Sequence, residues 1–205
     1  MPREKQQFDA MRTAAREKIT AAGLQLFAYK GLAATSIQDI ASLAGISAGL
    51  MYHYYKSKEE LFTELVETAV GSAAESTRTM FESDRSPAEK VRMFSKEIIE
   101  DIARSDWMSQ LYLLMIHYML VVDLPEKAAE IQEKGFAPLE SLKRTIIEGQ
   151  KTGEIKPDNP EEMAMLYFAA IEGLAISKLT MGDRFILPSP DLLSGLLLKP
   201  AEREV

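Results

Sequence analysis

Apolar residues recur at intervals of three and four positions along nearly the whole chain, and no stretch shows the sustained alternation of a half-buried strand. This pattern predicts an all-α protein. Breaks rich in proline, glycine and aspartate separate the periodic segments. The helices predicted in this way cover residues 13–30, 36–44, 47–54, 58 to about 81, 87–103, 106–122, 126–134, 137–151, 160–181 and 190–198.

The short segment from residue 36 to residue 44 has the spacing of one buried helix face. Thr35 or Ser36 can cap its first turn, and Gln38 or Asp39 can return the bond as in a capping box. Gly45 ends the helix. The apolar positions that define the face follow the order i, i+3, i+4 and i+7 and are Ile37, Ile40, Ala41 and Ala44.

A second short helix follows after a tight glycine-containing turn, and two helices joined in this way form a helix-turn-helix. The second helix begins with small residues, which allow its N-terminus to approach DNA closely. Its free backbone N–H groups favour phosphate oxygens. The polar rings of residues 52–55 can hydrogen-bond phosphates. Lys58 begins the next helix, where the helix dipole disfavours a cation unless a phosphate lies nearby.

Charge is distributed unevenly along a chain whose net charge is −7. Residues 1–58 hold 8 Lys and Arg against 4 Asp and Glu, whereas residues 59–205 hold 16 against 27. A basic head on an acidic body suits a protein that contacts a polyanion with one end only. We therefore predict a DNA-binding domain over 1–58, with its motif at about 35–54, and a second domain over 59–205.

Composition argues against several other classes of protein. The chain has no cysteine and only two histidines, His53 and His117, so disulfides, thiolate chemistry and a histidine-built zinc site are not expected. We find no glycine-rich phosphate loop, and the carboxylates fall on polar helix faces as solvated charge, so neither an enzyme nor a cofactor is expected. The charged start and a longest apolar run of 12 residues, Leu111 to Val122, predict a cytoplasmic protein outside the membrane.

The run from Thr35 to Phe62, TSIQDIASLAGISAGLMYHYYKSKEELF, resembles the DNA-binding signature of the TetR (tetracycline-repressor) family of transcriptional regulators. The matching positions are Ile40-Ala41, Ala44-Gly45-Ile46-Ser47, Gly49, Tyr52, Tyr54 and Lys58-Glu59. The sequence departs modestly, with Ile46 where valine is commoner and Tyr55 where phenylalanine is usual. The resemblance implies an N-terminal three-helix head followed by a C-terminal helical bundle for ligand binding and dimerisation.

Carried over residue by residue, the resemblance implies roles in DNA binding. Thr35 and Ser36 would cap the first helix of the motif and contact phosphate, and Gln38 would reach a base edge. Tyr52, Tyr54 and Lys58 would hold phosphates. Met51 and Tyr55 would face the core of the head. His53 as an ordinary surface histidine remains an alternative. The expected DNA-binding residues are Thr35, Ser36, Gln38, Ser47, Ala48, Gly49, Leu50, Tyr52, His53, Tyr54 and Lys58.

The family resemblance further implies an effector in the bundle that changes the spacing of two heads. The segment 106–122 is rich in aromatic residues and methionine, which line adaptable apolar pockets, although the same residues can be plain core. Glu172 could recognise a cationic ligand or face solvent. The expected ligand-binding residues are Trp107, Met108, Tyr112, Met115, His117, Tyr118, Met119, Phe168 and Glu172.

The segments 160–181 and 190–198 predict a homodimer, because they are apolar on more faces than one core requires. The alternative is that both lie wholly inside one subunit. The expected interface residues are Leu166, Ala169, Ala170, Gly173, Leu192, Leu193, Leu196 and Leu197. Together these features predict a ligand-released repressor that binds a palindromic operator as a dimer. The rival is a helical ligand-binding or interaction protein whose head does not act in transcription.

Overall fold

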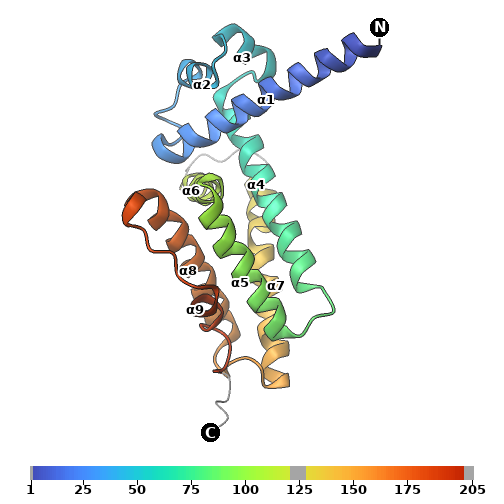
Figure 1. Cartoon of the computed structure of the whole chain (residues 1–205), viewed down its shortest axis with the longest axis vertical. Helices are drawn as coiled ribbons and strands as arrows, with labels where there is room; N and C mark the ends of the chain where they lie inside the picture. Colours follow the sequence, from blue (N-terminus) through green and yellow to red (C-terminus); the bar gives the residue numbers. More distant parts are fainter. Residues whose placement is uncertain (1, 121–127, 201–205) are drawn as a thin grey trace. The chain divides into compact units, whose positions relative to one another are not determined.

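The computed structural model describes residues 2–120 and 128–200, and within them the chain is helical (Figure 1). The elements are α1 (Pro2–Lys30), α2 (Ile37–Ala44), α3 (Ala48–Tyr54), α4 (Lys58–Phe81), α5 (Pro87–Arg104), α6 (Trp107–Met119), α7 (Ala128–Thr152), α8 (Pro160–Met181), a 3-10 turn η1 (Gly182–Arg184) and α9 (Pro190–Ser194). Within the described residues, β-type backbone pairing takes the form of an isolated antiparallel bridge between Ile155 and Leu198. The predicted all-α class is confirmed.

The chain divides into two compact units, each with its own packing. The first unit, here called the head, contains residues up to 69 together with the described residues from 113 to 120. The second unit, the body, contains residues 70–112 and the described residues from 128 onward. Helices α4 and α6 each contribute to both units. The predicted domain boundary after residue 58 stays a prediction.

The head is built around the C-terminal half of α1, which packs against α2 (Figure 1). Ile19 and Phe27 of α1 are fully buried, and the Phe27 ring meets the Phe62 ring of α4 edge to face at 5.2 Å. Tyr118 of α6 also packs against Phe62, with ring centroids 6.2 Å apart. Aromatic burial of this kind is the main source of stability in a small helical unit.

The body consists of α5 packed against α7, α8 and α9, with α7 also against α8 (Figure 1). Its core contains a polar pair: the Tyr167 hydroxyl lies 2.7 Å from Ser95 Oγ, and Ser95 in turn donates to the Val91 carbonyl. Lys178 of α8 donates to the carbonyl oxygens of Ile102 and Ser105 at the end of α5. These bonds satisfy carbonyls that a helix end leaves without partners.

A glycine allows three segments of the body to meet closely. A Cβ at Gly149 would lie 2.6 Å from Ile155 Cδ1 and 2.9 Å from Pro87 Cβ, far inside normal contact. The Gly149 carbonyl accepts hydrogen bonds from the backbone N–H groups of Glu154 and Ile155 at 2.8 and 3.0 Å. Gly153, with φ of 81°, makes the reversal after α7 possible.

Several predicted boundaries are wrong. The helices expected at 126–134 and 137–151 are one helix, α7, which continues through Pro138. Buried Ile131, Leu142 and Ile146 lie on both sides of the proline, and we attribute the continuity to their burial, which outweighs the proline's cost. Residues 121–122 and 126–127, at the ends of two predicted helices, lie outside the described residues.

The ends of the chain also differ from the prediction. Helix α1 begins at Pro2 rather than at residue 13, because the preceding polar residues are good helix formers despite lacking an apolar stripe. Helix α9 ends at Ser194 rather than at residue 198. The chain then turns so that the Lys156 N–H donates to the Leu197 carbonyl at 2.9 Å.

Candidate DNA-binding site

Local capping fixes α2 and its turn. Ser36 caps α2: its hydroxyl accepts from the Asp39 N–H at 3.1 Å, and the Asp39 carboxylate accepts from the Ser36 N–H at 3.0 Å. The Ser36 hydroxyl also donates to Asp39 Oδ2 at 2.8 Å, and this bond, followed by the one from the Ser36 backbone N–H, lowers the pKa of Asp39 below its usual value. Gly45 ends the helix in the left-handed region at φ of 67°. The predicted capping box and the glycine stop are confirmed.

Helix α3 is held against the head by two buried side chains. Met51 is fully buried and Tyr55 nearly so, as predicted. The Tyr55 hydroxyl donates to Glu64 at 2.9 Å and accepts from Arg16 Nε at 3.3 Å. Burial raises the pKa of Tyr55. The pKa of Arg16 is raised first by its hydrogen bond to the Tyr55 hydroxyl and then by its hydrogen bond to the Glu64 carboxylate. The cluster fixes the orientation of α3 because it ties α1, α3 and α4 together.

The opposite side of α3 faces solvent. Ser47 caps its N-terminus by accepting from the Leu50 N–H at 3.1 Å. Gly49, Leu50, Tyr52 and His53 are exposed, and Ala48 and Tyr54 are half-buried. Small residues at the N-terminus and polar rings further along therefore lie on the surface of one short helix, as a recognition helix requires.

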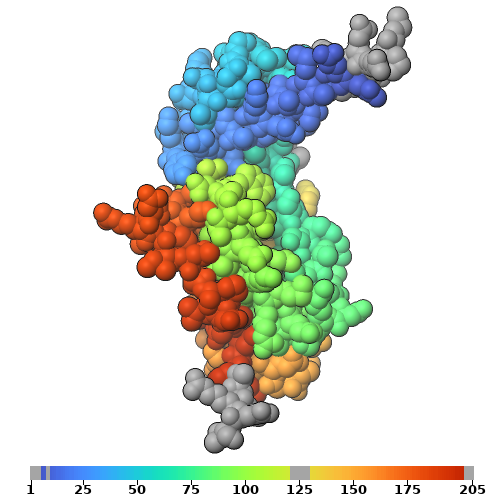
Figure 2. All heavy atoms as spheres, in the orientation of Figure 1, coloured from blue at the N-terminus to red at the C-terminus, as the bar shows by residue number. Residues whose placement is uncertain are grey.

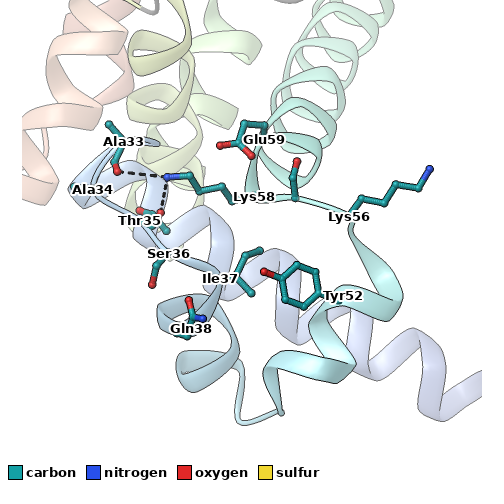
Figure 3. Close-up of a pocket in the computed structure, with 11 residues that line it drawn as sticks. Ala33, Ala34, Thr35, Ser36, Ile37, Gln38, Tyr52, Lys56, Lys58 and Glu59 are labelled. Atoms are coloured by element: carbon teal, nitrogen blue, oxygen red, sulfur yellow. Dashed lines mark hydrogen bonds between the residues drawn. The ribbon is translucent and has the colours of Figure 1, made fainter.

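A first groove, of about 430 Å³, separates the start of α2 from the end of α3 (Figure 3). Tyr52 stands over it with its ring turned toward Ile37, and Gln38 lies on the α2 side (Figure 3). The lining residues are Ala33, Ala34, Thr35, Ser36, Ile37, Gln38, Tyr52, Lys56, Ser57, Lys58 and Glu59. The groove thus brings together residues of both helices that were predicted to meet DNA.

The two lysines at this groove point in different directions (Figure 3). The Lys58 ammonium group turns inward and donates to the carbonyl oxygens of Leu32 and Thr35, each at 2.8 Å. Lys56 extends away from the groove wall (Figure 3). Phosphate binding by Lys58 stays a prediction that would require these bonds to break. Lys56 was not singled out, although it lies in the same Tyr-Lys-Ser-Lys run.

Thr35 differs in its burial from the other predicted DNA-binding residues. Its side chain is buried, at 1% exposure, and its hydroxyl donates to the Gly31 carbonyl at 2.8 Å. A phosphate contact through this hydroxyl would require that bond to open, whereas Ser36 and Gln38 remain accessible. The structure therefore gives Thr35 a structural task at the end of α1.

A second groove, of about 440 Å³, lies between α1 and the last turn of α3. The Tyr54 hydroxyl donates to the Arg12 carbonyl at 3.4 Å, and the His53 and Tyr54 rings meet edge to face at 5.7 Å. Its lining residues are Arg12, Thr13, Arg16, His53 and Tyr54. The arginines were missed because the sequence pattern gave no reason to place α1 beside α3.

The predicted ligand residues are divided between the units. In the head, His117 Nε2 lies 3.0 Å from the Ala28 carbonyl, Tyr118 is buried against Phe62, and Met115 is half-buried. Met119, also in the head, is exposed, as is Trp107 in the body. Met108, Tyr112, Phe168 and Glu172 belong to the body as well. Burial, and then the charge of Glu172, raises the pKa of Tyr112, so these two side chains share one region.

The predicted dimer residues also separate into two groups. Leu193 and Leu197 are 3% and 1% exposed and belong to the core of the body, which corrects their assignment to an interface. Leu192 and Leu196 point away from that core and are exposed. On α8, Leu166, Ala169 and Gly173 are exposed and Ala170 is half-buried. The wrong assignments arose because neighbouring helical residues such as Leu192 and Leu193 point about 100° apart, and because Leu196 and Leu197 lie beyond the end of α9 at Ser194.

The described residues include no group of three or more His, Asp or Glu that could hold a metal ion. A helical head in which an exposed seven-residue helix, α3, follows a glycine turn has the arrangement of a helix-turn-helix. Residues 19–65 match the family described as bacterial regulatory proteins, tetR family. The head is thus similar to the DNA-binding domain of this family.

Relatives match mainly through the head. The chain is 48% identical over 56 residues to the uncharacterized HTH-type transcriptional regulator YerO of Bacillus subtilis, covering 27% of this chain and 19% of that protein. It is 38% identical over 78 residues to the HTH-type transcriptional repressor KstR2 of Mycobacterium tuberculosis, covering 37% and 39% of the two chains. The match thus spans between a fifth and two fifths of these relatives.

The fold similarity extends further than the sequence similarity. The structure of the ketosteroid transcriptional regulator KstR2 of Mycobacterium tuberculosis aligns with a TM-score of 0.70, covering 90% of this chain and 95% of that one at 20% identity. The N-terminal helix-turn-helix head followed by a helical C-terminal region, as predicted, is therefore the fold of this protein.

Proposed function

We propose that the protein is a transcriptional repressor that binds a palindromic operator as a homodimer and is released by a small-molecule effector. The observation that carries this proposal is the exposed side of α3, flanked by two grooves with basic linings, on a head that matches the tetR family. The proposal places such a regulator in the cytoplasm.

DNA contacts divide by chemistry between the exposed residues of α2 and α3. Gln38 and Leu50 are exposed and suited to base edges, where an amide reads adenine and an aliphatic side chain contacts thymine methyl groups. Tyr52 and Lys56 flank them and supply phosphate contacts, which fix register without reading sequence. Ser47, Ala48 and Gly49 allow the close approach.

A single α3 of seven residues contacts few base pairs, so specificity demands a pair of heads. Two recognition helices held about 34–36 Å apart read successive major-groove faces of a palindrome. We assign the pairing surface to the exposed side of α8, where Met165 and Leu166 are 55% and 61% exposed. In the space-filling view the segment around the end of α8 forms part of the body's surface (Figure 2).

The length and composition of α8 are also compatible with a membrane-spanning helix. The span Pro160–Arg184 is long enough to cross a membrane, and an 18-residue window within it has a mean hydropathy of 1.3 and is 28% buried. A second copy of the same helix covers such a face equally well, and Gly173 and Ala169 permit close helix approach. The DNA-binding head favours the dimer.

The effector site belongs to the body. Tyr112, Phe168 and Glu172 lie in this unit, and although Glu172 is exposed, partial desolvation raises the pKa of its carboxylate. A partly desolvated carboxylate beside aromatic rings suits a ligand that is largely apolar and carries one polar or cationic group. An effector that prefers the head spacing unable to fit the operator shifts the population away from DNA.

The test is a gel shift with the full-length protein and the DNA immediately upstream of its own gene. A specific, competable complex at nanomolar protein is expected, with a footprint of two half-sites about one helical turn apart. Equal binding to scrambled DNA of the same composition would contradict the proposal and favour a ligand-binding or interaction protein.

A further inference from the structure

Helix α1 extends well before the segment that matches the tetR family. It begins at Pro2, whereas the family match begins at residue 19. The N-terminal half of α1 therefore lies outside the part of the chain whose role the family match indicates. It nevertheless reaches the recognition helix, because Arg12 and Thr13 line the same groove as His53 and Tyr54.

The lining of this second groove is cationic. Two of its five lining residues are arginines, a third is a histidine, and none is acidic. Arg16 is engaged, with Nη2 lying 2.8 Å from Glu64 Oε1. Among the described residues, no acidic side chain pairs with Arg12, and Arg12 is exposed. A guanidinium left without a carboxylate beside a groove is available to an anion that enters it.

Tyr54 fixes the distance between this arginine and α3. Its hydroxyl donates to the Arg12 carbonyl at 3.4 Å, so the backbone of α1 at residue 12 is held directly against the last turn of the recognition helix. The Tyr54 hydroxyl is therefore engaged in a hydrogen bond within the protein, and the phosphate contact predicted for Tyr54 is better supplied by Arg12. A charged group fastened to the recognition helix in this way arrives at the DNA together with it.

We propose that Arg12 binds a DNA backbone phosphate next to the bases that α3 reads, with His53 forming the other wall of the site. This inference rests on the proposed function. The planar guanidinium can donate two parallel hydrogen bonds to one phosphate, which gives the contact geometry as well as charge. The contact adds affinity and fixes register, and it does not discriminate between bases.

The experiment measures the salt dependence of DNA affinity for the full-length protein and its variants. The probe is a duplex that the wild type selects from a random-sequence pool, with binding followed by fluorescence anisotropy from 50 to 300 mM KCl. Arg12→Gln removes the charge while keeping good helix propensity. Lys18→Gln is the matched control, because it removes one charge from the same helix at an exposed position that lines neither groove.

For Arg12→Gln we expect affinity to fall about tenfold at low salt, and the salt slope to fall by about 0.9 per protomer. The preferred sequence stays the same. Arg12→Lys keeps most of the slope because the charge remains, and Lys18→Gln stays close to the wild type. Far-UV circular dichroism checks that each variant is folded.

The possible failures are distinguishable. If the wild type selects a duplex but Arg12→Gln and Lys18→Gln have equal slopes, the Arg12 site is overturned and the proposed function stands. A changed base preference in Arg12→Gln would also overturn the phosphate assignment. If the wild type selects no duplex, both the proposed function and this inference fail.

Discussion

The ammonium nitrogen of Lys58 lies 2.8 Å from the carbonyl oxygen of Thr35. It makes the same distance to the Leu32 carbonyl, so one side chain closes the loop that follows α1. A lysine in the first turn of α4 opposes the helix dipole. The two carbonyl oxygens explain the position of Lys58, because they bind its ammonium group directly and hold it more strongly than a distant anion in solvent would.

The first prediction concerns the two lysines of this loop. Lys58→Gln removes charge-assisted bonds to carbonyls and should lower the free energy of unfolding by about 2 kcal/mol, measured by urea denaturation. Lys56→Gln should leave the unfolding midpoint unchanged, because the Lys56 side chain extends into solvent (Figure 3). It should instead weaken DNA binding. A pair of variants with equal midpoints would contradict the inward role of Lys58.

The second prediction separates phosphate contacts from base contacts at the first groove. Tyr52→Phe combined with Lys56→Gln should weaken binding to every duplex and reduce the salt slope by about 0.9 for each phosphate that the protein no longer neutralises. Gln38→Ala and Leu50→Ala should instead change which duplex is preferred, by about 1–3 kcal/mol at the base concerned. Unchanged affinity in the double variant would remove these residues from the site.

The third prediction tests the pairing surface of α8. Nothing lies within 4 Å of a Cβ placed at Gly173, so Gly173→Arg costs the single subunit nothing sterically, and arginine has the better helix propensity. We expect the variant to sediment as a monomer at micromolar concentration. Gly71→Arg on α4 is the control, since that position is equally open. A Gly173→Arg protein that remains dimeric would place the interface elsewhere.

The fourth prediction follows from the Ser36–Asp39 capping box. The hydrogen bonds from Ser36 lower the pKa of Asp39, so its carboxylate is more acidic in the folded protein than in the unfolded chain. The resulting stability is present above the unfolded pKa of about 3.9 and is lost as pH falls through the lower, folded value. The difference in unfolding midpoint between wild type and Asp39→Asn should therefore shrink below about pH 4.

Replacing Ser36 supplies the control for that measurement. Ser36→Ala removes the donor hydroxyl and with it the largest cause of the lowered pKa of Asp39. In this background, the effect of Asp39→Asn on stability should vary less with pH. An unchanged pH dependence would mean that other charges, rather than the capping box, control the Asp39 carboxylate.

The local features of the head were predictable because short-range chemistry decides them. Ile37 and Ile40 are buried as their spacing indicated, Met51 is buried as the family resemblance implied, and Gly45 ends α2 as expected. The direction of Lys58 was not predictable, because its partners at residues 32 and 35 belong to a different loop. A sequence motif fixes which residue is present, whereas distant backbone groups decide what its side chain binds.

The body shows the same division. The apolar stripes predicted the helices, but the continuity of α7 through Pro138 depends on burial contributed by other helices. Leu192 and Leu193 are chemically identical in sequence, yet one is exposed and the other lies in the core. Adjacent residues of a helix point about 100° apart, so the way α9 packs on the body decides which leucine faces inward.

Close packing at Gly149 restricts how the body can diverge in evolution. Since a Cβ there would overlap the side chain of Ile155, Gly149→Ala should destabilise the protein by about 1–3 kcal/mol. In an Ile155→Ala background the same change should cost less, and a double-mutant cycle measures the difference. Positions 149 and 155 are therefore expected to change together among homologues, so a side chain can be gained at the first only when bulk has already been removed at the second.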